Sequence, residues 1–461
     1  MVLTPRYAQL PEKFFEKLDA VEFSQHSVLY WNESLAKELG LTDRLFYSSV
    51  QLAQAYAGHQ FGHFVPQLGD GRARLVGEIQ DRNGHLFEVH LKGSGSTKFS
   101  RRGDGLATLD AVLRELIVSE SMHNLAIPTT RTLAVLGTGE KVYRENEHPG
   151  AIQVRIARSH VRVGTFEYFA ARGDTAAIKL LADEMIHRLF PQLKTEANPY
   201  HALFEMVMEK QIQLVSSWLQ VGFIHGVMNT DNTLISGETI DYGPCAFMEA
   251  YNPVKVFSSI DHQGRYAYAR QPQIIKWNLT VLGHCLLPLF AENGEAASQM
   301  LETALSRFEG TFHKVWLEGM VRKLGLTEIK PGDESLLQEF LTILNKDKID
   351  FTLGFRGLSE AMQPTNKEMQ HWLAKWITRV TSPSKTMAQV QKDLEAINPL
   401  IIPRNHLVEK AIQSAVKNND FSFTENLLGA LAMPFSDPKH FSDFKKPATD
   451  EEQVHATFCG T

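Results

Sequence analysis

The segment HGVMNTDNTLISGETIDYG, residues 225–243, carries polar side chains at a spacing that suits metal and phosphate chemistry. Asn232 and Asp241 stand nine residues apart, on either side of the short apolar stretch TLISGETI. A hairpin-like path through that stretch brings their amide and carboxylate oxygens together. Because Mg²⁺ binds few protein oxygens together with phosphate oxygens, the pair predicts a nucleotide–metal site. Two unrelated polar loop residues are the plainer alternative, which the longer pattern disfavours.

The same segment matches the pattern H-x-D-x-x-x-x-N followed by D-F-G that kinase-like folds use. His225, Asn232 and the D-Y-G triplet beginning at Asp241 occupy the matching places, but Val227 stands where that pattern has its catalytic aspartate. Asp231 is the nearest carboxylate that could accept a proton from an attacking hydroxyl. An ordinary turn or capping aspartate is the alternative for Asp231.

Lys92 and Glu115 form a second candidate pair. Lys92 ends the alternating run LFEVHLK, which predicts a strand, and Glu115 lies in residues 106–125, whose periodicity predicts a helix. A carboxylate that borders the apolar stripe of a helix requires a cationic partner. Kinase-like folds hold a phosphate-binding strand lysine with a helix glutamate. A surface glutamate and a strand-end lysine are the alternative, which the order of the later motifs disfavours.

Glycines and cations near Lys92 are suited to hold phosphate. In LGDGRAR, residues 68–74, Gly69 and Gly71 free the backbone to approach an anion, and Arg72 adds positive charge. A plain turn is the alternative for so short a motif. Further cations follow along the chain: Lys98, Arg101, Arg102, Arg155, Arg158 and Arg162. As a group they can neutralise a triphosphate, including pyrophosphate expelled by attack at the α-phosphorus.

These residues must be positioned by a strand-rich first part and a helical second part. Asn83-Gly84 lies between the alternating runs LVGEIQ and LFEVHLK, which is a strong hairpin signal. Residues 65–160 are strand-like, residues 1–50 suggest short helices, and helical patterns dominate from about residue 175. The candidate residues gather near the join, which predicts an α+β fold whose two lobes close over a ligand.

The composition disfavours several classes of protein. The chain has 461 residues, 43% of them apolar, and a net charge of −6. An acidic balance disfavours nucleic acid as a partner, and three cysteines do not make a disulfide framework. The first residues, MVLTPRYAQLPEKFF, lack a secretory signal pattern, and the longest apolar run, 282–290, is too short for a membrane span. We therefore expect a soluble, cytoplasmic monomer without membrane contact.

Several long strings resemble those of one known family. They are RYAQLPEKFF, YAGHQFGHFVPQLGDGRA, LKGSGSTKFSRRGDG, HGVMNTDN, DYGP and DHQGRYAYARQP. The chain resembles, along nearly its whole length, the selenoprotein O family of kinase-like protein adenylyltransferases. The resemblance implies a bilobal protein-kinase-like fold. Together with the patterns above it suggests four parts: an N-terminal helical leader at 1–60, a β-rich nucleotide-binding lobe at 61–170, a helical lobe with the catalytic and metal-binding loops at 171–300, and a helical C-terminal extension with a polar tail at 301–461.

The resemblance also implies an activity. The family transfers AMP from ATP to Ser, Thr or Tyr hydroxyls of protein substrates, with Mg²⁺ (or Mn²⁺) as cofactor and pyrophosphate as the second product. ATP binds there in a reversed orientation, with its α-phosphate over the metal. The usual position of the base is then not where a base is needed, which accounts for Val227.

Carried over position by position, the resemblance assigns a role to each candidate residue. The nucleotide contacts are Gly69, Gly71 and Arg72 of the phosphate loop, Lys92 with its partner Glu115, Asp104 and Gly105 of the following loop, Arg155 and Arg162 on the terminal phosphates, and Asp241. Asp231 corresponds to the proton acceptor. Asn232 and Asp241 correspond to the metal ligands.

The cysteines depart from the family pattern. The family often ends in a redox-active cysteine or selenocysteine, which some members pair with a cysteine beyond the D-Y-G segment. This chain has Cys459 near its end and Phe257 where some members carry the partner, and Cys245 is the nearest substitute. The sequence leaves open whether Cys459 and Cys245 form a regulatory disulfide.

Two alternatives to adenylyl transfer also stay open. One is a kinase that transfers the γ-phosphate, with Asp231 as a displaced base. The other is a catalytically inactive pseudokinase that binds ATP and acts as a scaffold. Val227 disfavours the first alternative. The second is disfavoured because the chain keeps Lys92, Glu115, Asn232 and Asp241.

Overall fold

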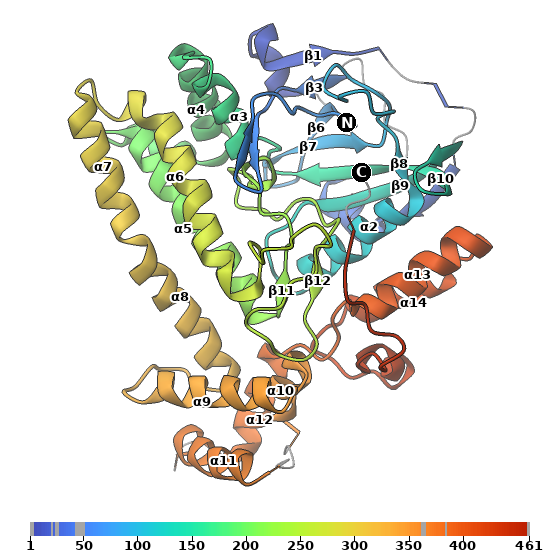
Figure 1. Ribbon diagram of the computed structural model, residues 1–461, viewed down its shortest axis with the longest axis vertical. Coiled ribbons are helices and arrows are strands. Elements are labelled where there is room, and N and C mark those ends of the chain that lie inside the picture. Colours follow the sequence, from blue (N-terminus) through green and yellow to red (C-terminus); the bar gives the residue numbers. More distant parts are fainter. Residues whose placement is uncertain are drawn as a thin grey trace.

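The computed structural model describes residues 4–19, 22–23, 27–41, 51–360, 366–382 and 385–458. Figure 1 shows a sheet lobe beside a helical lobe, with further helices that run below both and return toward the sheet lobe. This arrangement confirms the α+β, bilobal, protein-kinase-like fold expected from the sequence. The four domain boundaries stay predictions.

One antiparallel sheet forms the first lobe. Its spatial order is β1-β3-β6-β7-β10-β9-β2, and β8 pairs with β10. The strands are β1 (Phe15–Lys17), β2 (Ser27–Trp31), β3 (Leu52–Gln54), β6 (Ala73–Gln80), β7 (Leu86–Lys92), β8 (Ala107–Thr108), β9 (Arg131–Tyr143) and β10 (Glu147–Ala157). β6 and β7 form the hairpin predicted at Asn83-Gly84, where Gly84 adopts a φ of 85° that favours glycine.

The described part of residues 1–60 contains the short helices that the sequence predicts and, in addition, strands that it did not predict. These described residues supply β1, β2 and β3 to the sheet, and α1 (Glu33–Glu38) is their one α-helix. β1 and β3 have three residues each, which is too short for alternation to be visible in the sequence.

The helix predicted at 106–125 is α2 (Leu109–Asn124). It begins at Leu109 because the two preceding residues pair with β10 as strand β8. Its predicted apolar stripe is buried, and Leu113 and Leu116 are fully inaccessible to solvent. The sequence pattern therefore located this helix to within three residues at its start.

The second lobe is helical and carries short strands beside the candidate site. Its helices are α3 (Val163–Ala170), α4 (Thr175–Leu189), α5 (Pro199–Gln220) and α6 (Gln271–Phe290). Residues 221–270 connect α5 to α6 and contain β11 (Phe223–Ile224) and β12 (Ala246–Phe247), which pair with each other. The hairpin β4 (Gly58–Gln60) with β5 (His63–Val65) reaches from the sheet lobe to this connection, since the His59 backbone N–H donates to Thr230 Oγ1.

The C-terminal extension is helical, as predicted. Its helices are α7 (Gly294–Ser306), α8 (Phe308–Lys323), α9 (Asp333–Lys346), α10 (Phe351–Gly357), α11 (Lys367–Val380), α12 (Met387–Ile397), α13 (Asn405–Asn418) and α14 (Ser422–Leu431). In Figure 1, α13 and α14 lie directly below α2. Beyond α14 the tail is also engaged, because Phe444 is buried and Thr457 pairs with Ser258. None of the helices in the described ranges has the length and apolar character needed to cross a bilayer.

Candidate active site

Lys92 is the centre of the candidate site. It ends β7, and its Nζ lies 2.5 Å from Glu115 Oε1 on α2 and 3.1 Å from Asp241 Oδ1 in the D-Y-G segment. The Lys92 and Glu115 side chains are only 10% and 3% exposed. The structure thus brings the predicted Lys92–Glu115 pair together with Asp241, a predicted metal ligand, from three separate elements.

Glu115 also fixes the D-Y-G segment. Its Oε1 accepts a hydrogen bond from the Tyr242 backbone N–H at 3.1 Å. The same carboxylate oxygen therefore holds both the lysine and the residue that follows Asp241. Tyr242 is fully buried, and its hydroxyl group hydrogen-bonds to Thr129 Oγ1 on the link between α2 and β9. The predicted lysine–glutamate pair is thus part of a network that spans both lobes.

Asp241 is suited to bind a cation. Burial raises its pKa, but the charges of Lys92 and Arg72 outweigh burial and hold the pKa of Asp241 well below its usual range. The residue is ionised at physiological pH and adopts a left-handed φ of 67°. A permanently charged carboxylate is the hard oxygen ligand that Mg²⁺ prefers.

Asn232 is the second predicted metal ligand, and one short segment ties it to Asp241. Asn232 Nδ2 donates to Val227 O at 3.1 Å, which leaves its Oδ1 as the atom available to a cation. His225 Nε2 donates to Ile240 O at 2.8 Å. Residues 225–227 therefore contact Asn232 itself and Ile240, the residue directly before Asp241. Over the described part of the chain, no group of three or more His, Cys, Asp or Glu side chains forms a metal cluster. An amide oxygen and a carboxylate oxygen are donor types that Mg²⁺ accepts alongside phosphate oxygens.

Asp231, the predicted proton acceptor, is 8% exposed. Its Oδ2 accepts a long hydrogen bond of 3.4 Å from Gln60 Nε2 on β4, and burial raises the pKa of Asp231 to about 6. Its Oδ1 is buried and has no hydrogen-bond partner among the described residues. An unpartnered carboxylate oxygen can accept the proton of an attacking hydroxyl group. Val227, at the position of the usual base, is an apolar core residue with 4% exposure.

The predicted phosphate loop packs tightly against the loop that follows Lys92. Gly69 has a φ of 74°, and a Cβ atom there would lie 2.1 Å from the Phe99 ring. A Cβ on Gly71 would lie 2.9 Å from the Phe99 carbonyl oxygen. Arg72, at the end of this loop, is close enough to Asp241 to lower its pKa. Both glycines are therefore required, because Phe99 lies too close to this loop to leave room for a Cβ atom at either position.

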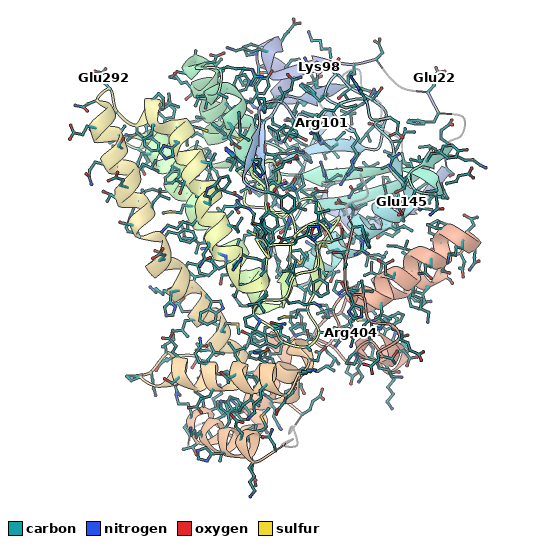
Figure 2. All side chains as sticks on the ribbon, viewed as in Figure 1. Glu22, Lys98, Arg101, Glu145, Glu292 and Arg404 are labelled. Atoms are coloured by element: carbon teal, nitrogen blue, oxygen red, sulfur yellow. The ribbon has the colours of Figure 1, made fainter. Side chains whose placement is uncertain are left out.

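The two ends of the loop at residues 93–105 lie against each other. The Gly95 N–H donates to Gly105 O at 3.1 Å, and a Cβ on Gly105 would lie 2.2 Å from the Gly95 carbonyl carbon. Asp104 is exposed and pairs with Arg144 at 2.8 Å, and this hydrogen bond lowers the pKa of Asp104. Lys98 and Arg101 (labelled in Figure 2) and Arg102 are also exposed. The structure thus places Asp104 and these cations on the surface of the sheet lobe.

Arg155 and Arg162 are buried, with exposures of 3% and 5%. Arg155 Nη2 lies 3.4 Å from His90 Nδ1, and Arg162 Nη2 donates to Asp70 Oδ1 at 3.4 Å. Within the described ranges, the Nε atoms of both arginines are buried without a hydrogen-bond acceptor. Two buried guanidinium groups with unused donors are what a polyphosphate chain would satisfy.

The sequence prediction missed several neighbours of these arginines. Asp70 lies within the glycine motif itself, is 1% exposed and contacts Arg162. His90 precedes Lys92 by two residues on β7 and stacks on His160, with ring centroids 3.6 Å apart. Strand alternation places His90 on the same face as Lys92, and this signal was available in the sequence. Gln60, which contacts Asp231, had no such signal because a separate hairpin brings it there.

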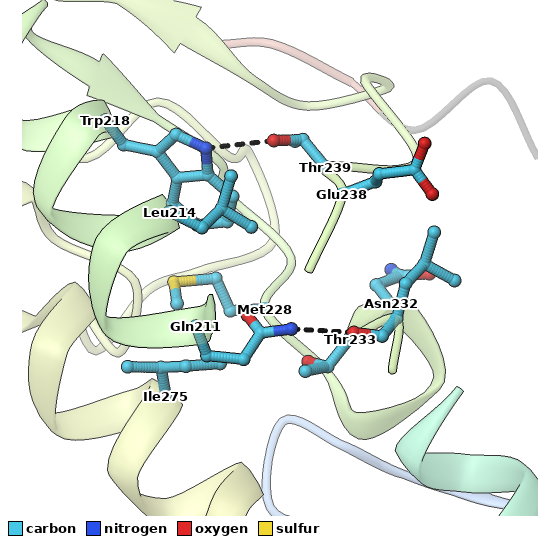
Figure 3. Close-up of a pocket in the computed structure, with 10 residues that line it drawn as sticks. Gln211, Leu214, Trp218, Met228, Asn232, Thr233, Glu238, Thr239 and Ile275 are labelled. Carbon is cyan, nitrogen blue, oxygen red and sulfur yellow. Dashed lines mark hydrogen bonds between the residues drawn. The ribbon is translucent and has the colours of Figure 1, made fainter. Parts of the chain in front are cut away.

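A small internal cavity lies behind the loop that carries Asn232. Figure 3 shows that it is lined by side chains of α5 and of the 228–239 segment, with Trp218 Nε1 donating to Thr239 Oγ1 at 3.0 Å. Its volume is about 10 Å³, which is at the limit for one water molecule. The cavity is therefore a packing feature and not a nucleotide site.

Cys245 lies two residues after the D-Y-G triplet. It is buried, and its thiol donates to Tyr242 O at 3.1 Å. Burial raises the pKa of this thiol well above its usual range, which keeps it protonated. Cys459 lies outside the described residues, so the pairing of the two cysteines and the redox role of the tail stay predictions.

Comparisons with known proteins show the family to which this chain belongs. The sequence pattern of the family described as "Protein adenylyltransferase SelO" matches residues 1–432. The "Protein nucleotidyltransferase YdiU" of Bradyrhizobium diazoefficiens is 47% identical, covering 99% of this chain and 98% of the relative. The protein of the same name from Rhizobium etli is 48% identical, covering 99% and 96%.

Among solved structures, ROP2 from Toxoplasma gondii is described as a virulence factor with a protein-kinase fold and no enzymatic activity. It is 12% identical, covers 76% of this chain and 92% of its own, and has a TM-score of 0.25. The family match and the two full-length relatives are sufficient to identify the family. This chain belongs to the SelO family of protein adenylyltransferases.

Proposed function

We propose that this nucleotidyltransferase transfers AMP from ATP to Ser, Thr or Tyr hydroxyls of protein substrates and releases pyrophosphate. The observation that carries the proposal is the placement of carboxylates and cations around Lys92. The usual position of a kinase base is a buried valine, Val227. Asp231 Oδ1, by contrast, has no hydrogen-bond partner among the described residues, and the carboxylate is close enough to Arg162 for that charge to lower its pKa. This arrangement favours attack at the α-phosphorus over attack at the γ-phosphorus.

Different residues bind different parts of the nucleotide. Lys92, held by Glu115, provides a positive charge to the phosphates. The buried Arg155 and Arg162 offer unused donors to the terminal phosphates and neutralise the charge that develops on pyrophosphate as it leaves. Gly69 and Gly71 let the phosphate loop pack against the loop that follows Lys92, and Arg72 adds positive charge near Asp241. Gly105 and Asp104 contact the nucleotide from that following loop.

Asn232 and Asp241 would hold Mg²⁺ or Mn²⁺, and the metal would neutralise phosphate charge and orient the α-phosphate. Asp231 accepts the proton of the attacking hydroxyl group, and the oxygen of that hydroxyl group attacks the α-phosphorus. The bond between that phosphorus and the bridging oxygen of pyrophosphate breaks. AMP remains on the protein substrate through a phosphodiester bond.

A paired label-transfer assay tests this proposal. The purified chain is incubated with Mg²⁺, an acceptor protein and ATP labelled at either the α- or the γ-phosphate, and the intact mass is recorded. Label retained only from the α-phosphate, with a mass increase of one AMP unit, supports adenylyl transfer. Label retained only from the γ-phosphate establishes the kinase alternative instead, and absence of both labels favours the scaffold.

An Asp241→Ala variant tests the site within the same assay. We expect it to abolish metal-dependent transfer and to weaken Mg-ATP binding, because it removes the charged metal ligand. Asp183→Ala, on the exposed face of α4, removes a carboxylate whose partners among the described residues are Lys179 and Tyr200, and it serves as the matched control. Full turnover in the Asp241→Ala variant would refute the site assignment.

A further inference from the structure

The helix that carries Glu115 lies between the sheet and the C-terminal extension. Its stripe residues Leu109, Val112, Leu113, Leu116 and Ile117 share one buried apolar cluster with α13 and α14. From α13 and α14 that cluster takes Leu407, Val408, Ala411, Ile412, Ala415, Leu427, Ala430 and Leu431. Figure 1 shows these two helices against the side of α2 that faces away from the sheet. α2 therefore owes much of its burial to residues nearly 300 positions later in the chain.

An ion pair reinforces this contact. The Arg114 guanidinium group on α2 pairs with the Glu409 carboxylate on α13, and the two side chains are 10% and 35% exposed. Arg114 directly precedes Glu115, so the pair lies one helical position from the residue that holds Lys92. Such a partly buried pair restrains rotation and sliding of α2 more than an exposed pair does.

The other end of the connection is anchored beside the D-Y-G segment. Arg404, which directly precedes α13, is fully buried and contacts Glu249 at 3.0 Å and Asp350 at 2.8 Å. Figure 2 shows Arg404 at the junction between the extension and the two lobes. Asn405 Nδ2 donates to the Phe247 carbonyl of β12, four residues beyond the D-Y-G triplet. α13 thus runs from the segment that follows Asp241 to the helix that carries Glu115.

α2 is consequently joined to the D-Y-G segment by two routes. The direct route is the hydrogen bond from the Tyr242 N–H to Glu115. The indirect route passes from Arg114 through α13 to Arg404 and β12. In kinase-like enzymes the lysine–glutamate pair must be in place for activity, and the position of the glutamate helix decides whether it is.

We infer that α13 acts as a permanent clamp that holds α2 in its nucleotide-binding position, with Arg114 and Glu409 as positioning residues. The inference rests on the proposed nucleotide site around Lys92. The clamp belongs to the same chain as α2. Glu115 is therefore held on Lys92 and Tyr242 without a modification or a partner protein to move the helix.

Charge reversal across the clamp tests the inference in the full-length chain. The variants are Arg114→Glu, Glu409→Arg and the double variant that exchanges the two charges. We expect each single variant to weaken Mg-ATP binding by roughly 3- to 10-fold, as for residues coupled by direct contact, and the double variant to restore it to within about twofold. Hydrogen exchange at the Tyr242 amide should accelerate in the single variants and return in the double variant.

Reversal of an exposed pair in the same extension serves as the control. Lys375 on α11 and Glu339 on α9 lie 2.9 Å apart and are 45% and 46% exposed, away from α2. Lys375→Glu should leave both ATP affinity and Tyr242 exchange unchanged. Single clamp variants that lower only the melting temperature, with wild-type ATP affinity and exchange, would overturn the inference, and so would failure of the double variant to restore them.

The proposed function and the clamp fail in different ways. Label transfer from the γ-phosphate in the wild-type chain refutes adenylyl transfer. The clamp is still judged by ATP affinity and by exchange at Tyr242, neither of which depends on which phosphate is transferred.

Discussion

Replacing Glu115 with glutamine is a sharp test of the network around Lys92. The substitution keeps the shape of the side chain and an acceptor oxygen for the Tyr242 N–H, but it removes the charge that lies 2.5 Å from Lys92 Nζ. Removing one partner of a buried ion pair costs about 3–5 kcal/mol. Lys92 retains Asp241 at 3.1 Å, so we expect a smaller loss in the free energy of unfolding, about 2–3 kcal/mol.

A Glu115→Ala variant separates charge from hydrogen bonding. It also deprives the buried Tyr242 N–H of its acceptor, which adds about 1–3 kcal/mol. Urea denaturation followed by tryptophan fluorescence measures both variants against the wild type. In addition, Lys92 should turn fully to Asp241 in either variant, so the Mg²⁺ concentration needed for half-maximal activity should rise.

Two outcomes would contradict this reasoning. A Glu115→Gln variant within about 0.5 kcal/mol of the wild type would show that Asp241 alone compensates Lys92. Equal losses for the glutamine and alanine variants would show that the hydrogen bond to Tyr242 contributes nothing. Glu339→Gln, which removes a carboxylate from an exposed pair, is the matched control and should be nearly neutral.

Three further substitutions have predictable effects. Lys323 is 3% exposed, and burial lowers its pKa to about 7. Because an unfolded lysine has a pKa of about 10.4, the unfolded state binds more protons than the folded state between these two values. The free energy of unfolding should therefore rise from about pH 7 to about pH 10. Lys323→Met should abolish that rise when urea denaturation is compared at pH 7 and pH 9. At pH 7 the variant should have a free energy of unfolding about 1–3 kcal/mol higher than the wild type, a value that already includes the loss of the hydrogen bond to Asn398. Gly69→Ala should weaken ATP binding and lower the melting temperature, because its Cβ would overlap the Phe99 ring at a φ of 74°. Gly310→Ala, in open space on α8, should instead stabilise by about 0.5–1 kcal/mol, and an equally mild effect at Gly69 would refute the steric argument.

The chemistry of the site was largely predictable from local sequence. Lys92 at a strand end, Glu115 on a periodic helix, and Asn232 and Asp241 around a short apolar stretch are local patterns, and the structure brings Lys92, Glu115 and Asp241 into contact. The metal-binding role of Asn232 and the proton-accepting role of Asp231 stay proposals. Local patterns succeed here because phosphate and metal chemistry restricts both residue types and spacing.

Contacts between distant segments were not predictable in this way. The hairpin that brings Gln60 to Asp231 and the strands β1 and β3 have no periodic signal, because segments of three residues cannot display one. Asp70 and His90 lie in predicted segments, yet their contacts with Arg162 and Arg155 depend on how two strands and the start of α3 converge.

The apolar stripe of α2 shows the difference between what local sequence specifies and what tertiary contacts specify. By itself the sequence determined that Leu109, Val112, Leu113, Leu116 and Ile117 form one apolar face, since helical periodicity is a local property. Only the tertiary structure decided what covers that face, namely α13 and α14 from the far end of the chain together with residues of β9 and β10. An apolar stripe specifies that burial is favourable but not by which partner, because the hydrophobic effect is non-directional.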